Sequence, residues 1–525
     1  MSGPRIPSRA DPNSGAEAVT RNTLFNVLGQ GFPLLVGLVA IPIVTHSLGD
    51  TRFGLLGLAW AILGYFSIID FGLGIATTKL AAEYLAKDDE TAVTQLVRVS
   101  TVTHLVLGIS AGVFLGLLTP LLTSTVLGVP TPLIAEARTT FYLIAATLPF
   151  LFLALGFRAV LEAAQRFDLV NLIRLPSNSA IFLIPAIAAP LGVGLPGIIL
   201  LLLIVRMITC WITERAMRRA LPFFKWSLRV DWRSLGPLIS FGKWVAVSNL
   251  LNPLLLYLDR FLLGSLAGLA AVAYYTAPFE VAVRLLIVPA GLASALFPAL
   301  TLLATRDEES SLHGQVSQSV RHLVVLAGVP ALLLMMFSGD LILAWLGSAY
   351  AERSTVALQI LAGGIFVNSL AFVPYRCLHA VGRPDITAKF HLLELPIYVV
   401  TAWILVGRYG VSGAALAWTL RVTLDAGLLF LALWIVVGIS PTRFLANNGA
   451  RAVVSLAALA AVLVALTAGI PNVLPRLALA GFATLTFAVF NWYKVLTAAE
   501  RVTVLGMFGR EGKEGGGRRE EWAES

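Results

Sequence analysis

Charged side chains inside apolar stretches are the residues of this sequence most able to do chemistry. An ionisable group in lipid is costly, and it marks a functional site by default. Asp70 is the first of them, and it lies deep in an apolar run with Phe71 and Gly72 directly after it. No basic residue lies one turn away to neutralise it. Asp70 is therefore a candidate site for a coupling proton or cation; the alternative is a carboxylate that is hydrogen-bonded to a neighbouring helix.

Two further pairs of opposite charge are spaced four residues apart. Glu280 precedes Arg284, which is the favourable order for an ion pair on a helix. The pair could only neutralise itself, or Glu280 could orient the Arg284 guanidinium to bind phosphate through two parallel hydrogen bonds. Arg421 and Asp425 have the same spacing. We interpret that second pair as structural.

Three more sites carry charge in or near apolar segments. Asp259 and Arg260 are adjacent, so on a helix they point about 100° apart and cannot both face one cavity. Arg260 is a candidate ligand for an anionic substrate, and the alternative is an anchor at the end of a helix. Lys243 either extends toward the cytoplasmic surface or meets an incoming phosphate. Glu394 has no evident partner in the sequence.

Neutral polar residues mark one face on each of two apolar helices. Asn22, Asn26 and Gln30 recur every four residues, and Asn249 and Asn252 lie on one face of a later helix. Such faces either hydrogen-bond to other helices or line a cavity that binds sugar. Prolines interrupt the helices in question, and kinks there would shape a cavity or a hinge: Pro33, Pro42, Pro253 and Pro289.

Membrane helices must position these residues. The chain has about fourteen apolar stretches, each close to the ~20 residues that a helix needs to cross a bilayer. Backbone groups in lipid must be satisfied internally, and the stretches lack the alternation of barrel strands, so the predicted fold is an all-α, polytopic membrane protein. The predicted spans are 22–45, 54–78, 99–122, 139–160, 174–192, 195–215, 237–259, 271–301, 320–338, 355–378, 389–406, 411–437, 451–469 and 474–493.

Composition excludes several classes of protein. Hydrophobic residues make up 58% of the chain and charged residues 13%, about half the charged share of a soluble domain. The net charge of +9 does not indicate a nucleic-acid partner, because the basic residues stand at helix ends and form no single patch. No phosphate-binding loop, zinc motif or long catalytic loop occurs, so we expect no cofactor, no metal and no enzymatic activity. Residues 1–20 lack an apolar core, so we expect no cleavable signal peptide.

Basic residues predict the orientation. Of the 38 lysines and arginines, 28 fall in loops on the side of the N-terminus and 5 in the opposite loops. Cytoplasmic loops carry the excess of Lys and Arg, so both termini are predicted to be cytoplasmic.

The loop Met217–Gly236 divides the predicted helices into six, six and two. Glycines recur at a constant offset, Gly49 with Gly268 and Gly72 with Gly291, which indicates two parallel lobes with substrate at their interface. The predicted parts are a disordered cytoplasmic tail (1–20), a first lobe (21–216), an inter-lobe loop (217–236), a second lobe (237–440), two last helices (450–493) and a disordered tail (506–525).

Several motifs resemble those of one transporter family. They are Leu238-Ile-Ser-Phe-Gly-Lys-Trp, Ser248-Asn249, Leu258-Asp-Arg-Phe-Leu-Leu-Gly264, Val272-Ala-Tyr-Tyr275 and Leu161-Glu-Ala-Ala-Gln-Arg-Phe-Asp168. In order and spacing they are similar to the lipid-linked oligosaccharide flippases of the Wzx type. That family belongs to the superfamily of multidrug and toxin exporters and lipid II flippases.

The resemblance implies alternating access around a central cavity between two six-helix lobes. A lipid-linked oligosaccharide would cross from the inner to the outer leaflet of the bacterial cell membrane, with glycosyltransferases and a polysaccharide polymerase as partners. Three alternatives remain: a cation-coupled multidrug exporter, a peptidoglycan-precursor flippase, and a membrane-embedded polysaccharide polymerase or ligase. The last would need clustered external Arg and His, which the nearly uncharged external loops do not supply.

Overall fold

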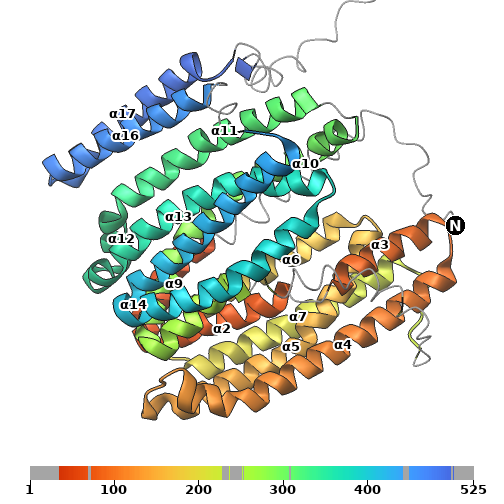
Figure 1. Ribbon diagram of the computed structural model, residues 1–525. Helices are drawn as coiled ribbons and strands as arrows, with labels where there is room; N and C mark the ends of the chain where they lie inside the picture. Colours follow the sequence, from red (N-terminus) through yellow and green to blue (C-terminus); the bar gives the residue numbers. More distant parts are fainter. Residues whose placement is uncertain are drawn as a thin grey trace, which may run out of the picture. The chain divides into compact units, whose positions relative to one another are not determined.

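The computed structural model describes residues 35–68, 72–227, 236, 251, 254–306, 309–440, 448–497 and 500–501. Within these ranges the secondary structure is helical and contains no strand (Figure 1). Ten of the described helices are long and apolar enough to cross a membrane. The prediction of an all-α, polytopic membrane protein is confirmed.

The chain divides into two compact units. The first unit contains residues 1–284, 342–357 and 388–421, and the second contains the remainder. These units do not follow the predicted lobes, whose boundaries stay a prediction. The helices that lie before Leu285 in the sequence belong to the first unit, and the last helices of the chain belong to the second.

The first unit begins with a helix at Leu35–Leu48. Its other helices before Leu285 are α2 (Asp50–Ile68), α3 (Leu73–Ala86), α4 (Glu90–Leu121), α5 (Ile134–Ala163), α6 (Phe167–Ala188), α7 (Leu195–Ala220), a segment over 254–266, and α9 (Leu269–Arg284). The predicted span 54–78 is not one continuous helix, because α2 ends at Ile68 and α3 begins at Leu73. Gly72 has a φ of 72° at the start of α3, a conformation that a side chain would disfavour.

The second unit contains α10 (Ile287–Thr305), α11 (Glu309–Met336), α16 (Ala450–Gly469) and α17 (Val473–Lys494). The predicted span 271–301 is also broken, since α9 ends at Arg284 and α10 begins at Ile287. Pro289 lies in the first turn of α10, where its missing N–H costs no hydrogen bond. A short helix that the sequence did not predict, α12 (Ser338–Leu346), precedes α13 (Ser348–Ala380).

One long helix holds two predicted spans. Residues 384–437 form α14 (Pro384–Val437), and Gly410 interrupts it with a φ of 54° and a ψ of −123°. The interruption falls between the predicted spans 389–406 and 411–437. The turn that separates those two spans is therefore a single glycine.

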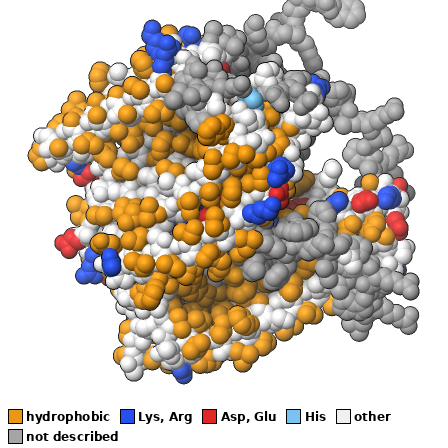
Figure 2. All heavy atoms as spheres, in the orientation of Figure 1, with side chains coloured by type: hydrophobic (Ala, Val, Ile, Leu, Met, Phe, Trp, Pro, Cys, Tyr) orange, Lys and Arg blue, Asp and Glu red, His pale blue; other side chains and the backbone are white. Residues whose placement is uncertain are grey.

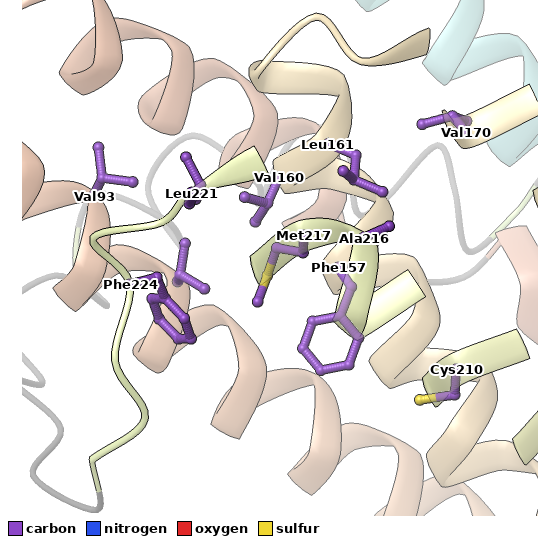
Figure 3. Packing of buried hydrophobic residues seen from close by; sticks show 11 residues of the cluster. Val93, Phe157, Val160, Leu161, Val170, Cys210, Ala216, Met217, Leu221 and Phe224 are labelled. Carbon is purple, nitrogen blue, oxygen red and sulfur yellow. The ribbon is translucent and has the colours of Figure 1, made fainter. Parts of the chain in front are cut away.

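Close packing of helices holds the first unit together. A Cβ on Gly112 of α4 would lie 2.7 Å from the Ala145 carbonyl of α5, so these backbones approach as small residues permit in membranes. Near the other end of the same helices, buried apolar side chains of α4, α5, α6 and α7, and of the segment that follows α7, form a cluster that includes Phe157, Met217 and Phe224 (Figure 3).

The outer surfaces of the helices are apolar. Hydrophobic side chains cover much of the face in Figure 2, and charged ones are few there. Large apolar residues are exposed in both units, for example Leu117 at 76% and Phe482 at 70%. In water such a surface would aggregate, but in a bilayer it contacts the lipid tails.

Candidate transport site

Three of the predicted site residues lie in the described part of the chain: Arg260, Glu280 and Arg284. The other six fall outside the described residues, so their roles stay predictions: Asn26, Gln30, Asp70, Lys243, Asn249 and Asn252.

Glu280 and Arg284 form the ion pair that their spacing predicts. Arg284 Nη2 donates to Glu280 Oε2 at 2.5 Å, and Arg284 Nε donates to the main-chain oxygen of Glu280 at 2.9 Å. Both side chains stay partly exposed, Arg284 at 28% and Glu280 at 20%. The Arg284 guanidinium carbon also lies 5.6 Å from the ring centre of Phe182 on α6. The pair is thus rigidly oriented and still accessible, as a ligand for an anion must be.

Arg260 is enclosed more completely. Its side chain is 2% exposed, and its guanidinium carbon lies 4.4 Å from the Phe279 ring centre and 5.3 Å from that of Tyr257. Its Nη2 is 3.9 Å from Glu280 Oε1. Such burial among rings favours the interpretation of Arg260 as a structural anchor. It also links Arg260 to Arg284 through the shared carboxylate of Glu280.

Adjacent tyrosines on α9 bind two different aspartates. The Tyr275 hydroxyl donates to Asp259, which is fully buried and also accepts the Arg260 N–H at 2.8 Å. The Tyr274 hydroxyl donates to Asp50 at the start of α2. The Tyr-Tyr motif of the sequence therefore joins α9 to two other helices at once.

We expect Arg260→Leu to destabilise the protein strongly, because it leaves the buried Asp259 carboxylate without its nearest cation. Breaking a buried pair from one side costs about 3–5 kcal/mol. Thermal unfolding of the detergent-solubilised protein measures the loss. Adding Asp259→Asn to Arg260→Leu should restore part of the stability, whereas a single variant as stable as the wild type would contradict an anchoring role.

Arg421 has a different partner from the one its spacing indicated. The structure pairs Arg421 Nη1 with Glu394 Oε2 at 3.6 Å, and Glu394 is fully buried. The prediction of an Arg421–Asp425 pair is thus replaced by a contact between the two halves of α14. The turn at Gly410 makes this contact possible, since it brings the halves back against each other.

A polar cluster that the sequence did not reveal joins the starts of three helices. Arg353 of α13 donates to the Tyr274 hydroxyl at 2.5 Å, and Ser354 donates to the Tyr274 main-chain oxygen at 2.7 Å. The ring centres of Tyr274 and Tyr350 are 4.8 Å apart. We call Asp50, Tyr274, Tyr350, Arg353 and Ser354 the Asp50 cluster. Its only signal in the sequence was the Tyr-Tyr motif.

Further along α2 than Asp50, several glycines face the neighbouring helices. A Cβ on Gly54 would overlap the Leu269 carbonyl of α9, and one on Gly57 would lie 2.8 Å from Thr276 Oγ1. A Cβ on Gly64 would overlap the Tyr257 hydroxyl. The absence of side chains lets α2 lie directly against α9 and the 254–266 helix.

One polar motif of the sequence lies outside the spans. Arg166, in the turn between α5 and α6, donates from Nε and Nη2 to the two Asp168 oxygens at 3.0 and 2.9 Å. This hydrogen bonding raises the pKa of Arg166 above its usual value. The pair lies within the turn, and its hydrogen bonds do not involve Glu280 or Arg284.

The structure of the chain resembles solved transporters. It superposes on "Lipid II flippase MurJ, inward closed conformation" with a TM-score of 0.68 at 14% identity, covering 89% of this chain and 98% of the other. An inward-facing multidrug resistance transporter of the MATE family gives a TM-score of 0.67 at 14% identity, covering 78% of this chain and 98% of the other. At these identities the likeness shows a shared fold.

Sequence comparisons are more specific. A "Putative O-antigen transporter" of Shigella flexneri is 30% identical over 413 residues, which is 78% of this chain and 97% of that protein. A "Probable low-salt glycan biosynthesis flippase" of Haloferax volcanii is 23% identical over 188 residues, or 36% of this chain and 39% of that protein. Residues 19–303 match the model of the family described as polysaccharide biosynthesis protein. The match spans more than half of the chain, which therefore belongs to the polysaccharide biosynthesis protein family.

Proposed function

We propose that this protein is a flippase that moves a lipid-linked oligosaccharide from the inner to the outer leaflet of the bacterial cell membrane by alternating access. Family membership and the names of the relatives support the class of substrate. The observation that carries the proposal is the Glu280–Arg284 pair, a fixed cation that is still accessible in an apolar chain.

The substrate class explains why that cation is needed. Lipid-linked oligosaccharides share a diphosphate whatever their sugars, and its charge must be balanced in a medium of low dielectric constant. Arginine stays ionised and offers a planar fork that matches phosphate oxygens. The two contacts from Arg284 to Glu280 leave further N–H groups of the guanidinium for a ligand.

The Asp50 cluster supports alternating access. With both termini in the cytoplasm, as we propose, the starts of α2, α9 and α13 lie at the outer face. The contacts among Asp50, Tyr274 and Arg353 then close the outer side of the first unit. For substrate to leave outward, these contacts and the glycine packing of α2 must open.

Export of the lipid-linked sugar tests the proposal as a whole. In a strain that lacks other flippases, the chain should restore arrival of its lipid-linked sugar at the outer leaflet. Normal protein levels without any such arrival would contradict it.

A tag at Ser525 tests the proposed orientation. We expect the tag to be inaccessible in intact cells and accessible after permeabilisation, because 28 of 38 basic residues lie on the side of the termini. A tag between Thr125 and Pro132 should show the opposite behaviour. Labelling of Ser525 from outside would contradict the proposed orientation and, with it, the proposed direction of transport.

A further inference from the structure

The helices of the first unit enclose a cavity that the Glu280–Arg284 pair does not line. Its volume is about 410 Å³, and its walls come from α2, α5, α6 and α7. That volume is at the low end of the ~300–1,000 Å³ that is usual for small-molecule sites. It suits a head group better than a complete oligosaccharide.

Three arginines from three different helices line this cavity: Arg158 of α5, Arg174 of α6 and Arg206 of α7. We call it the arginine cavity. Glu162 pairs with Arg158 at 3.2 Å. Within the described ranges, neither Arg174 nor Arg206 forms an ion pair or a hydrogen bond. Arg206 therefore has no ion pair among the described residues, and Glu162, which also attracts Arg174, is already paired with Arg158.

The arginines lie at different depths from the cytoplasmic ends of their helices. Arg174 is exposed and Arg206 is half-buried. Arg174 is seven residues from the start of α6 at Phe167, and Arg206 is fourteen residues from the end of α7 at Ala220. At 1.5 Å per residue these are about 10 and 21 Å from the ends that our proposed orientation places in the cytoplasm. A charge that entered beside Arg174 would meet Arg206 further inside.

Neutral polar residues accompany the arginines. Ser67, Ser177, Asn178, Thr209 and Thr213 also line the cavity. Leu161 and Val170 line it too and belong to the apolar cluster of Figure 3, which closes one side. The cavity thus combines an apolar wall with guanidinium and hydroxyl groups, the usual composition of a site for an anionic group.

We propose that the arginine cavity binds the diphosphate of a lipid that enters from the cytoplasmic leaflet, as a site separate from Arg284. Arg174 and Arg206 supply one guanidinium for each phosphate, and the Ser177 hydroxyl and the Asn178 amide donate to the remaining oxygens. Among the described residues Arg206 has no counter-ion, and an arginine at membrane depth is costly without one. The proposal rests on the proposed function only for the nature of the lipid that carries the diphosphate.

The cavity connects by contact to the transport site. Trp60 lines it, and the Trp60 ring centre lies 5.1 Å from that of Phe182. The same Phe182 ring lies against the Arg284 guanidinium. Trp60 and Phe182 therefore join the wall of the arginine cavity to the Arg284 guanidinium through two aromatic contacts.

Binding to the purified full-length protein in nanodiscs tests the proposal without any transport. The probe is geranylgeranyl diphosphate, with inorganic diphosphate and geranylgeranyl monophosphate as comparisons. We expect Arg206→Gln to weaken binding of the lipid diphosphate at least tenfold, and Arg206→Lys to weaken it less. The matched control is Arg215→Gln, on the same helix, where the exposed guanidinium stacks on Trp211 outside the cavity; its binding should equal that of the wild type.

A second measurement separates a binding role from a structural one. Without ligand, Arg206→Gln should melt at the wild-type temperature or above it, because the change removes a half-buried cation that has no ion pair among the described residues. Wild-type affinity in Arg206→Gln, or equal loss in Arg215→Gln, would overturn the site. Equal affinity for the monophosphate would overturn the diphosphate assignment, and equal affinity for inorganic diphosphate would overturn the lipid assignment. If the wild-type chain binds the lipid diphosphate but does not restore export, that result would count against the proposed function and not against the cavity.

Discussion

Arg284→Ala is expected to lower export of the lipid-linked sugar about 100-fold at an unchanged protein level. Two hydrogen bonds from a charged donor contribute about 1.5–3 kcal/mol each. Losing even the lower amount twice corresponds to a factor of about 100. Arg284→Lys should keep part of the activity, since a point charge replaces the planar fork. The measurement is arrival of the sugar at the outer leaflet in a strain without other flippases.

Glu280→Gln should be milder than Arg284→Ala. The Arg284 Nε contact is to the Glu280 main-chain oxygen, which this substitution keeps. Arg306→Ala removes an exposed arginine at the end of α10 and serves as the control, with wild-type export expected. Wild-type export in Arg284→Ala would show that the Glu280–Arg284 pair is structural.

Gly54→Ala is expected to open the outer side of the first unit and to reduce export at least tenfold. The added Cβ would overlap the Leu269 carbonyl, and a main-chain atom cannot move aside as a side chain can. A cysteine placed at Thr276, which is 1% exposed, reports the opening. It should react with a membrane-impermeant maleimide in Gly54→Ala and stay protected otherwise. Both native cysteines are buried, so they add little background.

Gly116→Ala is the matched control for that variant. Gly116 also lies within a long helix, but a Cβ there meets nothing within 4 Å. Alanine favours a helix by about 1 kcal/mol over glycine, so this control should be neutral or slightly stabilising. Gly57→Ala should fall between the two, because the Thr276 side chain that it meets can rotate. Unchanged maleimide protection in Gly54→Ala would exclude this contact as the outer closure.

Sequence patterns predicted the long helices well, because lipid permits little besides an unbroken apolar helix. The predicted spans 451–469 and 474–493 correspond to Ala450–Gly469 and Val473–Lys494. Breaks inside apolar stretches were harder to locate. The start of α3 after Gly72 and the gap between α9 and α10 interrupt runs whose hydrophobicity does not change. Hydrophobicity indicates which residues contact lipid, and the residues before and after such a break both contact lipid.

Charge pairs were predictable only within one helical face. The Glu280–Arg284 pair follows from a spacing of four residues, and the structure confirms it. The Glu394–Arg421 contact depends on the turn at Gly410, which no local spacing encodes. Arg206 carried a signal that we did not use, since an arginine inside an apolar run is itself unusual. Most of the other residues that line its cavity come from other helices, so only the structure reveals the cavity.

The Glu394–Arg421 contact has a consequence for how the protein is made. Glu394 is fully buried, and the described structure gives it a cation that is synthesised 27 residues later. At about 5–20 residues per second, that interval lasts roughly one to five seconds. A ribosome that feeds the chain into the membrane therefore releases Glu394 before Arg421 exists. During that interval the contact between the two halves of α14 cannot form, so this helix pair is completed only after Arg421 has been synthesised.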